Sequence, residues 1–391
     1  MTSQRVYFGV FGSGLGHITR VLEIARRLPE GEFETRYSSS GQGLSFLQAN
    51  GLGGSSESSP PLDVEWTGGG GFSSHSVLPG FPSMFNKFLH QLAFERTAIR
   101  RYDPRVVVTD SRLSPVLAGK SMSYPVVTLL NQFKVLFPPR FRNRTGRFYE
   151  RVAGDALGLM WSLSDRVLVT DLPPPYTIGE ENIAGSEVSN VVEYVGFTAP
   201  MVELPAERVG RASETLGLDG RPLVFCQISG PDQTKGRFVD TLLKSAEALS
   251  RKYNLVISMG YSGGSQEPRR LANGGWLFDW CPIKDELFEL AAVVVARAGH
   301  STIGQCIDHV KPAVMVPIHN HPEQISNAEK FAKLGLGVTV RSERLTTESL
   351  LEAIDECASD PGYTKRLGLA CAVSKRYRGV ERCAEIIREM A

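Results

Sequence analysis

The chain has 391 residues, and because single hydrophobic cores stop growing at about 250–300 residues, this length predicts two or three domains, with two as the simpler expectation. Apolar residues make up 42% of the chain and charged residues 22%, which excludes the disordered, collagenous and coiled-coil classes. Residues 1–198 carry 19 basic and 18 acidic residues, residues 199–391 carry 24 of each, and the formal net charge is +1. This balance argues against a general nucleic-acid binder.

The six cysteines are widely spaced and form no CxxC pair, so neither a zinc ribbon nor a dense disulfide framework is expected. The first residues lead directly into an apolar, strand-like run without the long apolar stretch of a signal peptide, and no run approaches the ~20 apolar residues of a membrane span. We therefore expect a cytoplasmic protein that is not integral to a membrane.

The first half repeatedly places a short apolar run before a polar or Gly-rich turn and a helical pattern, as buried strands of parallel sheets do. The expected strands are Val6–Phe11, Val106–Thr109, Pro125–Leu130 and Val167–Thr170. Residues 51–72 are rich in Gly, Ser and Pro, which predicts an irregular loop. Residues 111–149 contain seven Lys or Arg and no acid, interleaved with Phe and Leu, which suits either a solvated loop and helix or contact with an anionic membrane.

A Pro- and Gly-rich stretch at residues 197–221 breaks periodicity and predicts a connection between domains. A second series of strands follows, at Leu223–Ile228, Leu255–Met259, Ala292–Ala296, Ala313–Val316 and Val338–Val340. We therefore expect two Rossmann-like α/β domains, at 1–198 and 199–391, facing across a cleft. The last helix, about 374–391, is expected to pack back on the first domain.

The segment GSGLGHITR at 12–20 is a Gly-rich turn between a strand and a helix. Gly14 and Gly16 would let backbone N–H groups approach an anion or a sugar at the helix start. The spacing departs from the dinucleotide fingerprint GxGxxG, and the second strand ends in Ser residues in place of an acid, so NAD binding is disfavoured.

His17 lies where this loop enters the helix, so its ring can face a ligand and take a proton from a hydroxyl near neutral pH. Asp110 closes a predicted strand, and strand carboxyl ends line the ligand crevice of open α/β sheets. Its carboxylate could therefore orient His17 and stabilise the imidazolium. A structural role for the ring, and an ordinary helix cap for the carboxylate, are the alternatives.

Residues 276–305 and 312–337 resemble the donor-nucleotide signature of GT-B glycosyltransferases, in particular the branch of natural-product and glucuronosyl transferases and the bacterial lipid-linked N-acetylglucosaminyl transferase. Trp280 and Ile283 match the turn that holds the nucleotide base. Residues 297–302, Arg-Ala-Gly-His-Ser-Thr, match the turn that binds the diphosphate. The resemblance therefore implies donor contacts from Arg297, Gly299, His300, Ser301 and Thr302.

Three further positions complete the matched donor site. Gln305 stands where the family usually has a Glu on the ribose hydroxyls, and an amide bonds two hydroxyls more weakly than a carboxylate. Glu323 and Gln324 resemble the pair that holds the donor sugar. Ser229 and Gly230 resemble the second phosphate-side loop, although Ser-Gly-Pro is also a common turn.

The resemblance implies an inverting transfer from a nucleotide-diphosphate-sugar, expected to be a UDP-sugar, to an acceptor whose candidates include a membrane lipid and a lipid-linked glycan. It also implies that the domain at 1–198 binds the acceptor and the domain at 199–391 binds the nucleotide-sugar. His17 would be the base and Asp110 its partner. No cofactor or metal is expected, since no DxD motif is present; a metal site formed by His300, His319 and His321 is the alternative. The rival functions are a nucleotide-sugar epimerase and a non-catalytic nucleotide-sugar-binding protein, and the membrane contact would place the enzyme at the inner face of the cell membrane.

Overall fold

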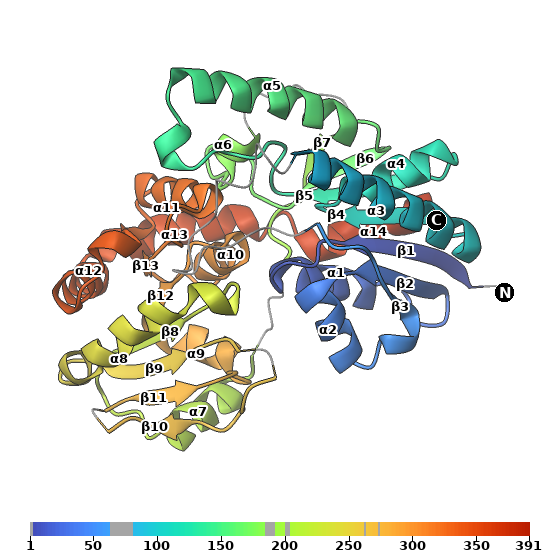
Figure 1. The fold of residues 1–391 in the computed structure, drawn as a ribbon. Helices are drawn as coiled ribbons and strands as arrows, with labels where there is room; N and C mark the ends of the chain where they lie inside the picture. The colour runs from blue at the N-terminus through green and yellow to red at the C-terminus, as the bar shows by residue number, and fades with distance from the viewer. Residues whose placement is uncertain (1–2, 63–80, 184–191, 200–203, 262, 273) are drawn as a thin grey trace. The chain divides into compact units, whose positions relative to one another are not determined.

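The computed structural model describes residues 3–62, 81–183, 192–199, 204–261, 263–272 and 274–391 (Figure 1). The described chain divides into two compact units. The first contains the residues up to 199 together with Tyr377–Ala391, and the second contains residues 204–376. The helix at the carboxyl end of the chain is therefore part of the first unit.

The first unit is built on one seven-stranded sheet in which all neighbouring strands are parallel. In spatial order its strands are β3 (Ser56–Ser58), β2 (Phe33–Ser39), β1 (Gln4–Val10), β4 (Val106–Asp110), β5 (Val126–Leu130), β6 (Arg166–Val169) and β7 (Val192–Tyr194). Its helices are α1 (Gly16–Arg26), α2 (Gly41–Ala49), α3 (Phe81–Tyr102), α4 (Leu113–Ser121), α5 (Arg144–Trp161), α6 (Glu180–Ile183) and α14 (Gly379–Met390).

Alternating side chains of the central strands bury themselves under helices on both faces of this sheet. Val6 and Phe8 of β1 pack with Ile18 of α1 and with Val380 of α14. Tyr7, between them, faces the opposite side and joins the cluster formed by α3 and α4. A strand buried on both faces needs a continuous apolar run, which is what the sequence has at these positions.

The second unit repeats this architecture with a second seven-stranded sheet, parallel except where β10 pairs with β11. Its strand order is β10 (Arg269–Arg270), β11 (Trp276–Phe278), β9 (Asn254–Ser258), β8 (Leu223–Gln227), β12 (Ala291–Ala296), β13 (Ala313–Met315) and β14 (Gly337–Thr339). Its helices are α7 (Ala206–Thr215), α8 (Gly236–Ser250), α9 (Lys284–Leu290), α10 (His300–Asp308), α11 (Pro322–Lys333), α12 (Thr347–Ser359) and α13 (Pro361–Ser374).

The predicted Rossmann-like folds and all nine predicted strands are confirmed, with boundaries that differ by one or two residues. Two segments differ from expectation. The stretch 197–221, expected to be a connection, contains the helix α7, and the stretch 51–72, expected to be irregular, contains the short strand β3, while its residues 63–72 lie outside the described part. No helix among the described residues is long and apolar enough to span a bilayer.

A buried ionic cluster joins the carboxyl ends of the central strands of the first unit. Arg112, just after β4, pairs with Glu95 of α3, and both side chains are almost completely buried. Arg112 also donates to the carbonyl and the hydroxyl of Ser38, both at 3.1 Å, and Tyr7 donates to Glu95 at 2.8 Å. The cluster thus holds β1, β2, β4 and α3 together at this edge.

Replacement of Arg112 by Met is expected to destabilise the first unit by about 3–5 kcal/mol, because it leaves the Glu95 carboxylate buried without its cation. Hydrogen exchange of the β1 and β4 amides measures this loss. The double variant Arg112→Met, Glu95→Gln should recover most of the stability, and a double variant as unstable as the single one would contradict the ionic explanation.

Candidate functional site

The strand order reverses between β1 and β4 in the first unit, because β1 lies next to both β2 and β4. In doubly wound sheets this switch point leaves a crevice outside the carboxyl ends of the two strands, and ligands bind there. His17 follows β1 at the start of α1, and Asp110 is the last residue of β4. The two predicted catalytic residues therefore flank the switch point.

His17 and Asp110 form a direct hydrogen bond, with 2.8 Å between Nδ1 and Oδ1. The Asp110 side chain is fully buried, whereas 21% of the His17 side chain remains exposed. Since an ionised carboxylate only accepts, His17 carries its hydrogen on Nδ1, and Nε2 presents a lone pair. The imidazole also packs against the Phe11 ring in a T-shaped arrangement, with 5.4 Å between ring centroids.

Arg20, one turn after His17 on α1, completes a three-residue cluster that the sequence motif did not reveal. Its Nε and Nη2 donate to the two oxygens of Asp110, and its Nη1 donates to Thr170 Oγ1 at 3.1 Å. Its Nη2 also lies 3.1 Å from Nδ1 of His17, so both nitrogens converge on the same carboxylate oxygen. Arg20 is 4% exposed. The sequence did contain one signal for this cluster: His17 and Arg20 are three residues apart in GHITR, which places them on the same side of a helix.

The charge of Asp110 is set by this cluster. Burial by itself raises the pKa of the Asp110 carboxyl, but the charges and hydrogen bonds of Arg20 and His17 outweigh it and hold that pKa well below its usual range. Asp110 is therefore a carboxylate at neutral pH. A permanent carboxylate fixes the orientation and tautomer of His17 and stabilises an imidazolium when the ring accepts a proton.

The glycines of the loop before α1 allow its close approach to the neighbouring loop after β2. A Cβ on Gly12 would lie 2.2 Å from the carbonyl oxygen of Ser40, so a larger residue would push the two loops apart. Gly14 has a φ of +78°, a left-handed conformation that favours glycine, and its N–H donates to Gln42 Oε1 at 3.2 Å. The loop shape that presents Gly16 and His17 thus depends on the first two glycines.

In the second unit the predicted donor residues also gather at one sheet edge. Its switch point lies between β8 and β12. Ser229 and Gly230 follow β8, the 297–302 turn follows β12, and a Cβ on Gly299 would be 3.9 Å from Ser229 Oγ, so the two loops lie side by side. Trp280 follows β11 on one side of this pair, and Glu323 follows β13 on the other.

The helix α10 begins at this switch point with Gly299 as its N-cap and no side chain capping its first turn. The N-cap glycine has no side chain that could accept from the first-turn amides, and no acidic residue lies in the turn. Such a terminus carries a partial positive charge and favours an anion.

Arg297 lies behind this turn, 4% exposed. Its guanidinium donates to the carbonyls of Thr234 at 2.7 Å, Val316 at 3.1 Å and Pro317 at 3.3 Å, and it stacks over the Phe238 ring. Burial lowers the pKa of Arg297 to about 10, which leaves it charged at neutral pH. This geometry favours a role in joining the loops of the edge, whereas the sequence motif predicts direct contact with the diphosphate.

The β13 to α11 turn is held by the side chain of Gln324, whose Oε1 accepts from the Ile318 N–H at 3.0 Å. His321 caps α11 and accepts from the Gln324 N–H at 3.3 Å. Glu323 is half-buried in the same turn, next to the buried Gln324. The amide oxygen of Gln324, one of the two residues expected to hold the donor sugar, therefore already accepts a hydrogen bond within the turn.

The residues expected at the nucleotide base and ribose lie on the segment from β11 to α10 of the second unit. Trp280 is partly exposed between β11 and α9, Ile283 is the N-cap of α9, and Gln305 is buried on α10. Sequence reasoning missed Lys235, which is 1% exposed and donates to Asp232 Oδ1 at 2.8 Å and to the Gly260 carbonyl at 2.7 Å. Lys235 thus joins the loops that follow β8 and β9.

The histidines of the alternative metal site have other partners. His319 bonds Glu343, and His321 caps α11. Within the described part of the chain, no three His, Cys, Asp or Glu side chains are arranged to hold a metal ion. The six cysteines are all buried and unbridged.

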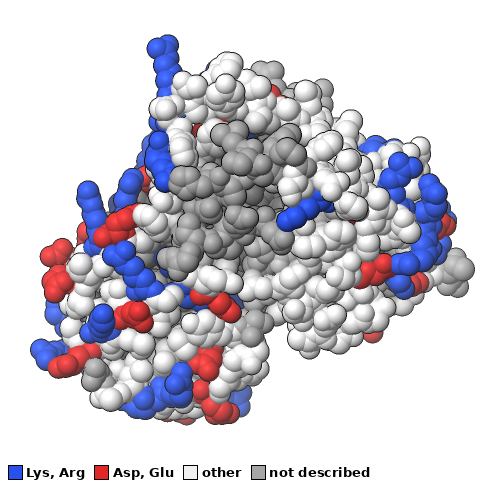
Figure 2. Space-filling model, viewed as in Figure 1, with Lys and Arg blue, Asp and Glu red and all other residues white. Residues whose placement is uncertain are grey.

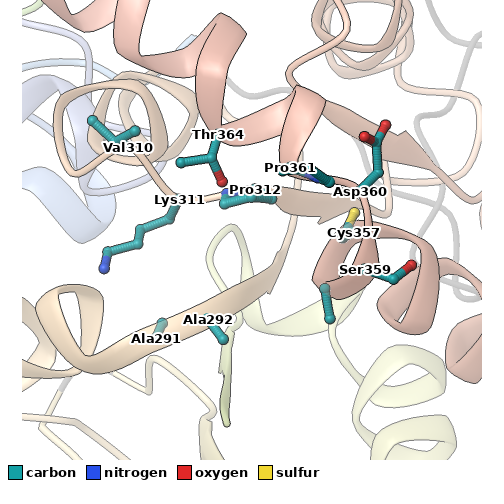
Figure 3. A pocket seen from close by; sticks show the side chains of 11 residues that line it. Ala291, Ala292, Val310, Lys311, Pro312, Cys357, Ser359, Asp360, Pro361 and Thr364 are labelled. Carbon is teal, nitrogen blue, oxygen red and sulfur yellow. The ribbon is translucent and has the colours of Figure 1, made fainter.

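A cavity of about 570 Å³ lies away from these residues, at the amino ends of β12 and β13 (Figure 3). Ala291, Lys311 and Cys357 are among its lining residues. A smaller cavity of about 100 Å³ reaches Arg297, with Thr234, Phe238 and His319 in its wall. None of the predicted donor residues lines the larger cavity. We therefore place the candidate donor site at the carboxyl ends of the strands of the second sheet.

Comparisons with known proteins agree with this architecture. The glycosyltransferase family 28 C-terminal domain matches residues 233–382. An uncharacterized glycosyltransferase of Methanopyrus kandleri is 25% identical over 342 residues, covering 85% of this chain and 91% of the relative. The chain is a glycosyltransferase. A further relative is the UDP-N-acetylglucosamine–N-acetylmuramyl-(pentapeptide) pyrophosphoryl-undecaprenol N-acetylglucosamine transferase of Staphylococcus haemolyticus, which is 27% identical over 174 residues, 43% of this glycosyltransferase and 47% of the relative.

Solved structures show that the glycosyltransferase has the GT-B fold. The calicheamicin glycosyltransferase CalG4 superposes with a TM-score of 0.68 at 15% identity, covering 100% of this chain and 98% of that one. SsfS6 of Streptomyces sp. SF2575, complexed with thymidine diphosphate, superposes with a TM-score of 0.63 at 15% identity, and 99% of each chain is covered. The resemblance inferred from residues 276–337 is confirmed at the level of family and fold.

The variant Arg20→Gln tests the buried cluster of the glycosyltransferase. At neutral pH it should destabilise the first unit by about 3–5 kcal/mol, because the Asp110 carboxylate loses its main cation. The low pKa of Asp110 contributes stability that is present above the unfolded-state pKa of about 4 and is lost as pH falls toward the folded-state pKa. In the variant Asp110 protonates more readily, so the difference between wild type and variant should shrink in acid.

Hydrogen exchange of the β4 amides at neutral pH and at about pH 4 measures this difference. Arg26→Gln is the matched control on the same helix, since Arg26 forms an exposed pair with Glu23 and should change stability by less than about 0.5 kcal/mol. An equal loss for Arg20→Gln at both pH values would show that packing, not charge, explains the effect.

Proposed function

We propose that the protein transfers a sugar from a nucleotide-diphosphate-sugar, a UDP-sugar in the first instance, to an acceptor nucleophile with inversion at the anomeric carbon. The observation that carries the proposal is the bond from His17 Nδ1 to the Asp110 carboxylate, which leaves Nε2 as a base. A purely structural histidine would not need an ionised, fully buried carboxylate behind it.

In the proposed reaction His17 Nε2 removes the proton of the acceptor hydroxyl as the oxygen attacks the anomeric carbon. The bond from that carbon to the diphosphate oxygen breaks on the opposite side, and the electron pair leaves with the nucleoside diphosphate. Asp110 stabilises the imidazolium formed on His17. Arg20 holds Asp110 and is a positioning residue.

In the second unit the uncapped start of α10 would receive the negative charge that develops on the departing diphosphate. Ser229, Ser301 and Thr302 supply hydroxyl groups at the same edge. Trp280 would stack on the base, Gln305 would bond the ribose, and Glu323 would hold the sugar. Amides and side chains would thus supply the charge stabilisation, and we propose that transfer persists when divalent ions are chelated.

The Staphylococcus relative is named for an undecaprenol-linked acceptor, and the SsfS6 structure is complexed with thymidine diphosphate. These two names support the proposal of a nucleotide-linked donor, and the first supports a lipid-linked acceptor. A thermal-shift screen against UDP-, GDP-, TDP- and CDP-sugars identifies the donor, because a ligand that binds only the folded state raises its stability. A sugar rearranged on the nucleotide without acceptor would favour the epimerase instead.

The variant His17→Ala is expected to lower kcat by about 10²–10⁴-fold, because it removes the base but none of the donor contacts. Donor affinity, measured by calorimetry, should stay within a factor of about two of the wild type. Unchanged turnover would remove His17 from the mechanism.

The variant Trp280→Ala should raise the donor Kd about tenfold, since stacking of a base on an aromatic ring contributes about 1–3 kcal/mol. The same calorimetric titration with the free nucleoside diphosphate isolates this contact from the sugar. His17→Ala serves as the reciprocal control, and equal Kd values for the two variants would contradict the assignment of base binding to the β11 to α9 turn.

A further inference from the structure

The helix α5 carries an exposed apolar stripe along its outer side. Phe148, Val152 and Leu159 recur at intervals of four and seven residues, which places them on one side of a helix. They are 60%, 51% and 70% exposed, and the adjoining Tyr149 is 59% exposed. Of the eleven large apolar side chains that are exposed among the described residues, seven lie between residues 135 and 163.

A row of arginines runs beside this stripe. Arg144, Arg147 and Arg151 follow one another at intervals of three and four residues, and all are exposed. None of them forms an ion pair with a residue that the structure describes, and Asp155 is the one exposed acid of α5. Residues 134–163 contain six basic and two acidic residues. Figure 2 shows a largely uncharged surface over α5, with basic side chains projecting beside the start of the helix.

The orientation of this surface is fixed by the inner side of α5. Gly146, Gly154 and Gly158 are buried there. A Cβ on Gly146 would lie 1.9 Å from the Phe141 carbonyl oxygen, and one on Gly154 would lie 2.7 Å from Cβ of Lys134. The glycines let the helix lie directly on the preceding loop, so the helix cannot rotate to bury Phe148 or Leu159 without a clash.

The preceding loop is tied to the same helix and adds to its surface. Buried Glu150 accepts from the Phe137 N–H at 2.5 Å and from Arg142 Nε at 3.0 Å. Val135 and Phe141 on this loop are 60% and 41% exposed. The apolar surface therefore extends from α5 onto a loop that is hydrogen-bonded to it.

We propose that this surface, α5 with residues 135–143, docks on the headgroup region of an anionic lipid bilayer. The apolar stripe would enter the boundary between headgroups and acyl chains, and the arginine row would lie along the anionic headgroups. Unpaired arginines flanking aromatic and aliphatic side chains fit this occupant better than a protein partner, which would need acids placed opposite each arginine. The inference deepens the proposed function and rests on it, because docking on a bilayer would bring the enzyme to a lipid-linked acceptor.

Vesicle co-sedimentation tests the proposal without donor or acceptor, so its outcome is separate from that of the transferase assay. The full chain should sediment with phosphatidylcholine vesicles containing about one third phosphatidylglycerol and far less with phosphatidylcholine alone. The triple variant with Arg144, Arg147 and Arg151 changed to Gln should bind about 100-fold more weakly, at roughly fivefold per arginine. The matched control changes Lys244, Arg344 and Lys365 of the second unit to Gln and should bind like the wild type.

The apolar contribution is tested with a matched pair of serine variants. Leu159→Ser should weaken vesicle binding about tenfold, whereas Leu369→Ser, at an exposed leucine of α13 in the second unit, should leave it unchanged. Circular dichroism and thermal melting establish that each variant is folded. The proposal would be overturned if the wild-type protein did not sediment with anionic vesicles. It would also be overturned if the Leu159→Ser variant bound them as well as the wild type does. A concentration-dependent dimer abolished by Leu159→Ser, with no vesicle binding, would assign the surface to a second copy of the chain.

Discussion

The strand order of the two sheets is the constraint on which the candidate site depends. In the first sheet β1 lies between β2 and β4, and in the second β8 lies between β9 and β12. The helices that follow β1 and β4, or β8 and β12, therefore leave toward opposite faces. The loops that lead from these strands into their helices therefore diverge at the carboxyl edge of each sheet, and their backbone polar groups are accessible to a ligand there. His17 with Asp110, and Ser229 with Gly299, occupy these two equivalent positions.

The two switch points carry opposite electrostatic arrangements, which fits a division of labour. The first holds a buried carboxylate, Asp110, whose charge is kept by Arg20 and directed at an imidazole. The second holds the uncapped helix start at Gly299 and the buried cation Arg297, which is bonded to carbonyl groups. One edge is suited to accept a proton and the other to receive negative charge, and these are the two roles that the proposed transfer assigns to them.

The central strands could be predicted because burial on both faces demands an uninterrupted apolar run, as at 106–108 and 255–257. The edge strands β3 and β10 could not, since their short polar sequences, Ser-Glu-Ser and Arg-Arg, have no such pattern. The position of His17 followed from its place between a Gly-rich turn and a helix. Arg20 was missed because its burial depends on Asp110 and Thr170, which lie 90 and 150 residues away in the chain.

The composition does not report where the charged residues of this protein lie. A net charge of +1 excludes a broadly basic surface, yet the local balance differs sharply from the mean. Arg20, Arg112 and Arg297 are buried, where they join loops from distant strands and contribute nothing to the surface. The arginines of α5 have no such partners within the described structure. Because a buried cation and an exposed one count equally in composition, only the fold separates the arginines that join loops at the carboxyl edges of the sheets from those that are exposed on α5.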